Sequence, residues 1–182
     1  MAHFAVTAVG ADRPGIVAGV TRAFVEHGCN LEDSSMTILR GQFAMMLVVD
    51  APPEVDAADL EEALAGPAAD LELVVAVRPL PAVDEGSTGA GPGDDRWTVS
   101  VYGADRPGIV HGVTSLLAEQ GVNIVDLSTR VIGSAEQPVY AMVLEVEVPA
   151  GVDPNALGDR LAEVAAGLGV EASLHLSDAD IL

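Results

Sequence analysis

The stretch that decides the fold is Gly10-Ala11-Asp12-Arg13-Pro14-Gly15-Ile16-Val17, which the chain repeats without a change as Gly103-Ala104-Asp105-Arg106-Pro107-Gly108-Ile109-Val110. Further residues recur at the same spacing after the repeat: Gly19 and Gly112, Val20 and Val113, Gly28 and Gly121, Asn30 and Asn123, Asp33 and Asp126. Self-similarity at a fixed distance indicates two copies of one structural unit. The second copy carries extra residues near positions 133–138.

A segment without apolar periodicity separates the two copies. Residues 79–95 are rich in proline and glycine, a composition typical of a linker. We therefore predict a first domain over residues 1–79, a linker over residues 80–95 and a second domain over residues 96–182.

Both copies predict the same order of elements: strand, helix, strand, strand, helix, strand. The expected strands cover residues 3–9, 30–39, 43–51 and 71–77 in the first copy, and 96–102, 123–131, 139–148 and 170–176 in the second. The expected second helices cover residues 55–65 and 154–167. This order predicts an α+β fold of two ferredoxin-like βαββαβ units, each an antiparallel four-stranded sheet with both helices on one face.

The first helix of each unit has clear boundaries in the sequence. Pro14 and Pro107 are expected at the first helical position, where the missing N–H costs nothing. Gly28 and Gly121 are expected in the left-handed conformation that commonly ends a helix. The predicted buried faces are Ile16, Val17, Val20, Ala23 and Phe24 in the first unit, and Ile109, Val110, Val113, Leu116 and Leu117 in the second.

The third strand of each unit is apolar on both faces. Phe43, Met45 and Leu47 alternate with Ala44 and Met46, and the second unit repeats this pattern over residues 139–144. Helices cover only one face of such a sheet, so a strand of this kind requires a second cover. We expect that cover to come from the other half or from a second copy of the chain, and predict a homodimer.

The repeated turn carries the features of an anion site. A turn at the start of a helix presents free backbone N–H groups that, with the helix dipole, favour an anion such as a carboxylate. Gly15 and Gly108 either let a ligand approach the backbone or only permit the turn. Asp12 and Asp105 either contribute to such a site or cap the helix.

Two further repeated residue types follow each first helix. Asn30 and Asn123 either offer a ligand an amide that donates and accepts, or tolerate a left-handed backbone after the glycine. Asp33 and Asp126 have the sign that an ammonium group requires, although they also suit a solvated strand. An anion site, an amide and a carboxylate together fit a free amino acid.

The charge balance excludes several classes of partner. The chain has 182 residues, with 28 acids against 8 bases, all arginine, and a formal net charge of -20. Such a surface repels nucleic acid and anionic lipid, so we expect no direct contact with either. The longest strongly apolar stretch, residues 43–49, is too short to span a membrane, and we find no targeting segment.

The chemistry-bearing residues form no catalytic or metal-binding constellation. Cys29 is the single cysteine, which excludes an intramolecular disulfide, fits a cytoplasmic protein and leaves no zinc cage. No serine or cysteine has the local signature of an activated nucleophile. His111 is not repeated, because Ala18 stands at its position in the first unit. We therefore expect no metal, no cofactor, no catalytic residue and no enzymatic activity.

The turn, the helix after it, and the following Gly-Cys-Asn or Gly-Val-Asn with a later Asp resemble the ACT domain, a regulatory module that senses amino acids. The resemblance covers residues 3–78 and 96–176. It implies that units pair through their sheets or helices, and that an amino acid binds where the first loop of one unit meets its neighbour. The positions that match the motif are Asp12, Arg13, Pro14, Gly15, Ile16, Asn30, Asp105, Arg106, Pro107, Gly108, Ile109 and Asn123.

The resemblance also implies a function. The expectation is a non-catalytic sensor whose units change their relative pose when an amino acid binds. It would control transcription, or an enzyme of amino-acid metabolism such as glycine cleavage, through a partner protein. The alternatives are an interaction module without a ligand and, less favoured, an enzyme on a ferredoxin-like scaffold.

Overall fold

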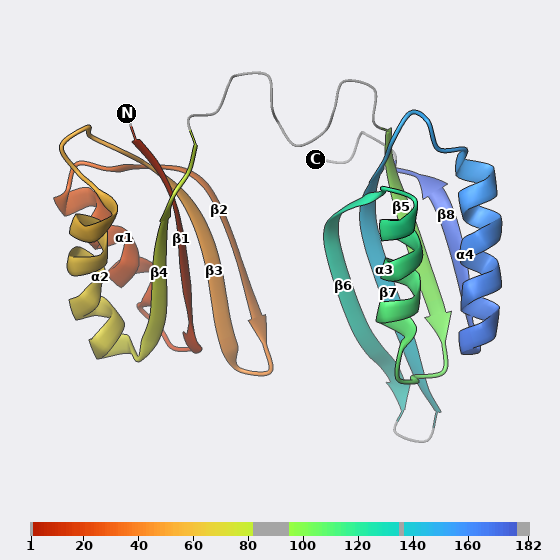
Figure 1. Cartoon of the computed structure of the whole chain (residues 1–182). Coiled ribbons are helices and arrows are strands. Elements are labelled where there is room, and N and C mark those ends of the chain that lie inside the picture. The colour runs from red at the N-terminus through yellow and green to blue at the C-terminus, as the bar shows by residue number, and fades with distance from the viewer. Residues whose placement is uncertain (1, 82–94, 135–136, 178–182) are drawn as a thin grey trace. The chain divides into compact units, whose positions relative to one another are not determined.

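The computed structural model describes residues 2–81, 95–134 and 137–177 (Figure 1). The chain divides into two compact units, Met1–Gly86 and Ser87–Leu182. Most of the expected linker, residues 82–94, lies outside the described residues. So do residues 135 and 136 of the second hairpin.

The first unit contains β1 (Ala2–Ala11), α1 (Ile16–Glu26), β2 (Asn30–Leu39), β3 (Gln42–Ala51), α2 (Ala57–Leu71) and β4 (Leu73–Pro79). The second contains β5 (Asp95–Gly103), α3 (Ile109–Glu119), β6 (Asn123–Ser134), β7 (Gln137–Val148), α4 (Pro154–Leu168) and β8 (Val170–Leu176). The strand orders are β2-β3-β1-β4 and β6-β7-β5-β8, with every pair antiparallel. Both helices of each unit lie on one face of its sheet, which confirms the predicted ferredoxin-like fold.

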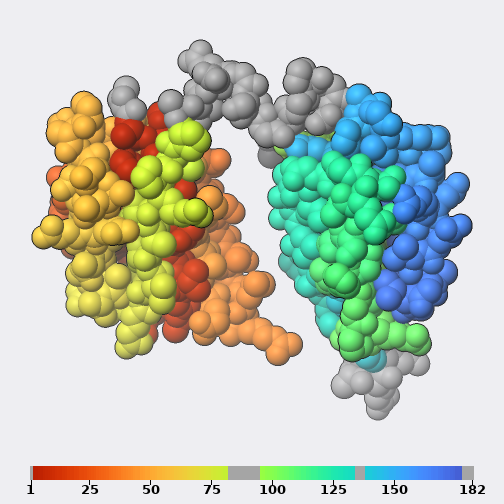
Figure 2. All heavy atoms as spheres, in the orientation of Figure 1, coloured from red at the N-terminus to blue at the C-terminus, as the bar shows by residue number. Residues whose placement is uncertain are grey.

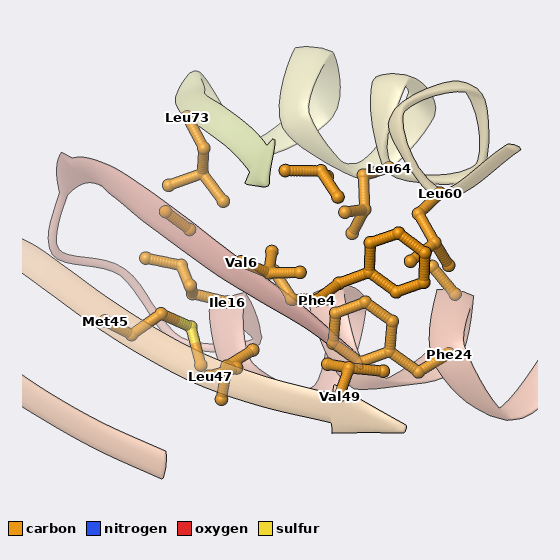
Figure 3. Packing of buried hydrophobic residues seen from close by; sticks show 14 of the residues in the cluster. Phe4, Val6, Ile16, Phe24, Met45, Leu47, Val49, Leu60, Leu64 and Leu73 are labelled. Carbon is orange, nitrogen blue, oxygen red and sulfur yellow. The ribbon is translucent and has the colours of Figure 1, made fainter. Parts of the chain in front are cut away.

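Each unit has its own apolar core between sheet and helices. In the first unit, Leu60 and Leu64 of α2 point toward Phe4 and Val6 of β1 (Figure 3). The remaining buried side chains of that core come mainly from α1 and β3: Ile16, Val20, Ala23, Phe24, Phe43, Met45, Leu47 and Val49. The prediction that Val17 and Val110 also belong to the buried faces is wrong, since they are 43% and 39% exposed.

The two first helices begin later than predicted. Gly15 has a φ of 96° and is the residue before α1, and Gly108 has the same φ before α3. Pro14 and Pro107 therefore lie in the preceding turn and are not the first helical residues. The left-handed glycine causes this shift, because helical geometry can begin only after it.

The second helix of the first unit continues past its predicted end. It runs to Leu71 although Pro67 lies inside it, and it ends at Glu72, whose φ is 55°. A β-carbon on Gly19 of α1 would come within 2.9 Å of the Leu71 side chain and 4.0 Å of that of Pro67. We attribute the additional helical residues to this packing of α2 on α1. The packing compensates for the loss of the backbone hydrogen bond that a proline inside a helix cannot form.

The edge strands β2 and β6 have little cover on either face. Every residue of β2 is exposed, including Met36 and Ile38. In Figure 2 the β2–β3 hairpin, in orange, lies at the edge of the first unit away from α2. Both edge strands carry a register shift near their start, between Leu31 and Asp33 and between Ile124 and Asp126. This is the pattern of a β-bulge, in which one strand contains an extra residue.

Candidate ligand-binding site

The repeated turn has the same backbone geometry in both units. Gly15 has φ and ψ of 96° and -5°, and Gly108 has 96° and -7°. Each glycine carbonyl accepts the first helical hydrogen bond, from Gly19 at 2.8 Å and from Gly112 at 2.9 Å. A β-carbon on either turn glycine would meet no atom within 4 Å, so the backbone conformation alone accounts for both residues within a unit.

No side chain caps the helices that follow the two turns. No cap hydrogen bond forms at α1 or α3, so the interpretation of Asp12 and Asp105 as caps is wrong. The other two helices are capped. Asp56 accepts from two backbone N–H groups of α2, and Asp153 accepts from one of α4. The first N–H groups of α1 and α3 therefore lack the side-chain acceptor that the other two helix starts have, and the helix dipole makes such groups a favourable environment for a carboxylate.

The predicted asparagines lie at the other end of each sheet. Asn30 pairs with Asp50, which pairs with His3 near the start of β1, whereas the turn follows Gly10. From His3 to Gly10 the strand rises about 24 Å. The structure therefore does not bring Asn30 into contact with the turn of its own unit, and Asn123 is separated from its turn in the same way.

The two asparagines also differ in their partners. Asn123 Nδ2 donates to Glu147 Oε2 at 3.1 Å, and Arg96 Nη2 lies 3.7 Å from Glu147 Oε1. In the first unit the corresponding carboxylate belongs to Asp50. Its Oδ1 atom is buried and has no hydrogen-bond partner among the described residues. Neither asparagine has a positive φ, so the left-handed interpretation of these residues is wrong.

The pKa values of two further side chains are raised, in part by nearby carboxylates. Burial, and after it the charge of Asp50, raises the pKa of the Cys29 thiol. Burial, and after it the charge of Asp105, raises the pKa of the Tyr140 hydroxyl. Phe43 occupies the matching position in the first unit and has no hydroxyl.

The arginines of the two turns have different surroundings. Arg13 Nη2 donates to Glu72 Oε2 at 2.9 Å. Gly169 stands at the matching position after α4, and Arg106 has no carboxylate within 4.0 Å among the described residues. Neither Glu72 nor Gly169 was predicted from the sequence, because both lie far from the turns along the chain. The aligned second-helix ends, one followed by an acid and one by a glycine, are the signal that could have revealed them.

Within residues 2–81, 95–134 and 137–177, no group of three or more His, Cys, Asp or Glu side chains could hold a metal ion. None of the helices described has both the length and the apolar sequence needed to cross a membrane.

Comparison with known proteins gives matches over both units. One model of the ACT domain matches residues 2–78 and another matches residues 97–160. The chain is 44% identical over 78 residues to a UPF0237 protein of Methanopyrus kandleri, covering 41% of this chain and 87% of that protein. It is 25% identical over 184 residues to the glycine cleavage system transcriptional repressor of Escherichia coli, covering 96% and 90%. The structure of an unknown protein from Galdieria sulphuraria superposes with a TM-score of 0.82 at 28% identity, covering 97% and 99%.

Proposed function

The chain belongs to the ACT-domain family, with one ACT domain in each unit, and we propose that it is a non-catalytic regulatory protein that binds a free amino acid. The observation that carries the proposal is the contrast between the four helix starts. Those of α2 and α4 are capped by aspartate, whereas those after the repeated turns have no side-chain cap. An arginine precedes each uncapped helix, so each turn combines N–H groups with a cation, which in the first unit is already paired with Glu72.

The separation of turn and asparagine within a unit bears on how such a site is completed. A ligand as small as an amino acid cannot reach from Gly10 to Asn30 of the same unit, because the length of β1 lies between them. Any contribution of the asparagine end to the site would therefore come from a unit in a second copy of the chain. Such a contribution would require the homodimer.

The edge strands supply the surface for that homodimer. Apolar side chains on β2 and β6 are exposed: Leu31, Met36, Ile38 and Leu39, and Val125, Leu127, Val131 and Ile132. Both strands also have only one neighbour in their sheets, which leaves backbone groups for pairing. A surface that combines exposed apolar side chains with an open strand edge favours association with another sheet.

The regulated process is proposed from the relative that matches both units. That relative is named as a transcriptional repressor of the glycine cleavage system. We propose that this chain controls transcription or an enzyme of glycine or related amino-acid metabolism. Because its net charge is -20, the control would act through a partner protein and not through contact with DNA.

A second candidate function is an interaction module without a ligand. The ion pair between Arg13 and Glu72 favours it for the first unit, because this arginine already has an anionic partner. Calorimetry of the full chain against the twenty amino acids, glycine and serine first, separates the two functions. Heat from at least one amino acid supports sensing. The absence of heat from all of them at millimolar concentration would overturn it.

A further inference from the structure

The first unit supplies its own counterion to the arginine of the repeated turn. Glu72 follows α2 directly, and its carboxylate accepts from Arg13 at 2.9 Å. Glu72 holds a φ of 55° at this position, a conformation uncommon for a residue with a side chain. The result is a turn whose cation is already neutralised by its own unit.

The second unit lacks that counterion at the matching position. Gly169 follows α4 with a φ of 74°, so the same backbone conformation is kept without a carboxylate. The Arg106 guanidinium lies against this glycine, because a β-carbon there would come within 2.6 Å of Nη1. Any side chain at position 169 would therefore displace the guanidinium from the place it occupies.

The second unit has an acid and an aromatic ring at positions where the first unit has two valines. Glu171 stands where the first unit has Val74, and Tyr102 stands where it has Val9. Tyr102 and Glu171 are direct partners on the neighbouring strands β5 and β8. Together with Gly103 and Gly169 they line a surface hollow of about 440 Å³. Glu171 makes no ion pair within 4.0 Å among the described residues.

We propose that this hollow in the second unit is the place where the amino acid binds, with its carboxylate on Arg106 and its ammonium group on Glu171, and that the Arg13–Glu72 ion pair closes the first unit to ligand. Glu171 lines the hollow, and the Arg106 guanidinium lies against Gly169, another of its lining residues. A cation and an anion in these places, not paired with each other, complement a zwitterion. The inference rests on the proposed function, since it specifies which turn takes the ligand. It predicts one binding site per chain and not two.

The test is a nuclear magnetic resonance titration of the ¹⁵N-labelled full chain with glycine and with L-serine, the former being the smallest zwitterion. We expect the amide signals of Gly103, Gly169 and Glu171 to shift with either probe. The matching amides of Gly10, Glu72 and Val74 in the first unit serve as internal controls and should stay in place. Acetate, which lacks the ammonium group, should bind more weakly than glycine.

Variants separate the two turns. Arg106→Gln should weaken glycine binding about tenfold or more, because charge-assisted hydrogen bonds are lost. Gly169→Glu should weaken it as well, since it restores the counterion in a backbone conformation that glutamate already adopts at position 72. Arg160→Gln removes another surface arginine of the same unit, one paired with Glu119, and is the matched control. Retained glycine binding by both Arg106→Gln and Gly169→Glu would overturn the inference.

Other outcomes are equally decisive. Equal shifts in the two units, or binding lost in Arg13→Gln and kept in Arg106→Gln, would overturn the inference and leave the proposed function standing. Equal binding of acetate and glycine would remove Glu171 from the site. No response of any amide to glycine or L-serine would overturn the inference, and calorimetry without heat from any amino acid would overturn the proposed function as well.

Discussion

The Asn123 amide donates a 3.1 Å hydrogen bond to the carboxylate of Glu147, a side chain that is almost completely buried. Arg96 approaches the other carboxylate oxygen at 3.7 Å. The corresponding carboxylate of the first unit, Asp50, has a buried oxygen without a partner among the described residues. The carboxylate at this position therefore has a hydrogen-bond donor in the second unit. In the first unit a buried oxygen of the corresponding carboxylate has none among the described residues.

Asn123→Ala should destabilise the second unit by about 1–3 kcal/mol, because it removes a donor from a buried carboxylate. Trp97, the single tryptophan, lies in β5 and reports unfolding of that unit by fluorescence in urea. Asn30→Ala is the matched control, since the Asn30 amide forms no hydrogen bond among the described residues, and the Trp97 transition should not move. A transition unchanged by Asn123→Ala would show that this hydrogen bond contributes nothing.

Asp50→Asn should make Cys29 react faster with iodoacetamide near pH 8. Burial is the main cause of the raised thiol pKa and the Asp50 charge is the second, so removing the charge moves the pKa down only in part. The rate should rise yet stay below that of the urea-unfolded chain. Asp70→Asn, a surface change in α2, should leave the rate as it is. A slower reaction of Asp50→Asn would contradict this assignment.

Gly108→Ala should destabilise the second unit by about 1–2 kcal/mol, because alanine avoids the left-handed backbone. Gly167→Ala in α4 should stabilise it by about 0.5–1 kcal/mol, because alanine favours a helix. A β-carbon meets no atom within 4 Å at either glycine, so only the backbone conformation distinguishes the two changes. Trp97 fluorescence in urea reports both. Shifts in the same direction would show that the left-handed turn is not rigidly held.

Ile38→Lys should convert the proposed homodimer to a monomer without unfolding the first unit. Ile38 is 48% exposed on the edge strand β2, so the charge is tolerated by the unit itself and costly only in an interface. Light scattering after gel filtration gives the mass. Val74→Lys on β4, at the opposite edge of the same sheet, is the control that should remain a dimer. A dimer of Ile38→Lys would remove β2 from the interface.

The hairpins and the elements of the second unit could be predicted from the sequence because their signals are local. The predicted bounds of β2 and β8 match the structure, since apolar alternation and a flanking glycine mark them. The second hairpin extends beyond its prediction through the pairs of Ile132 with Val139 and of Gly133 with Pro138. The continuation of α2 past Pro67 was not accessible, because it depends on packing against α1.

Only part of the candidate site could be predicted from the sequence. The repeated turn is visible in the sequence. Its uncapped helix starts were not predicted, because they depend on the left-handed conformation of Gly15 and Gly108, which the structure shows. The nearness of Asn30 to the turn along the chain was misleading, because α1 carries the chain back to the other end of the sheet. Contacts such as Arg13 with Glu72 join residues that the sequence separates widely, so no local pattern predicts them.

The bulge near the start of β2 restricts how another strand can add to that edge. Its extra residue, Glu32, interrupts the regular ladder, so an incoming strand finds regular spacing only from Asp33 to Leu39. A displaced strand would lose hydrogen bonds at one end and could not recover them beyond the bulge. The second unit has the same interruption at Val125. Each bulge would thus limit the register of the proposed assembly and oppose indefinite sheet growth into fibres.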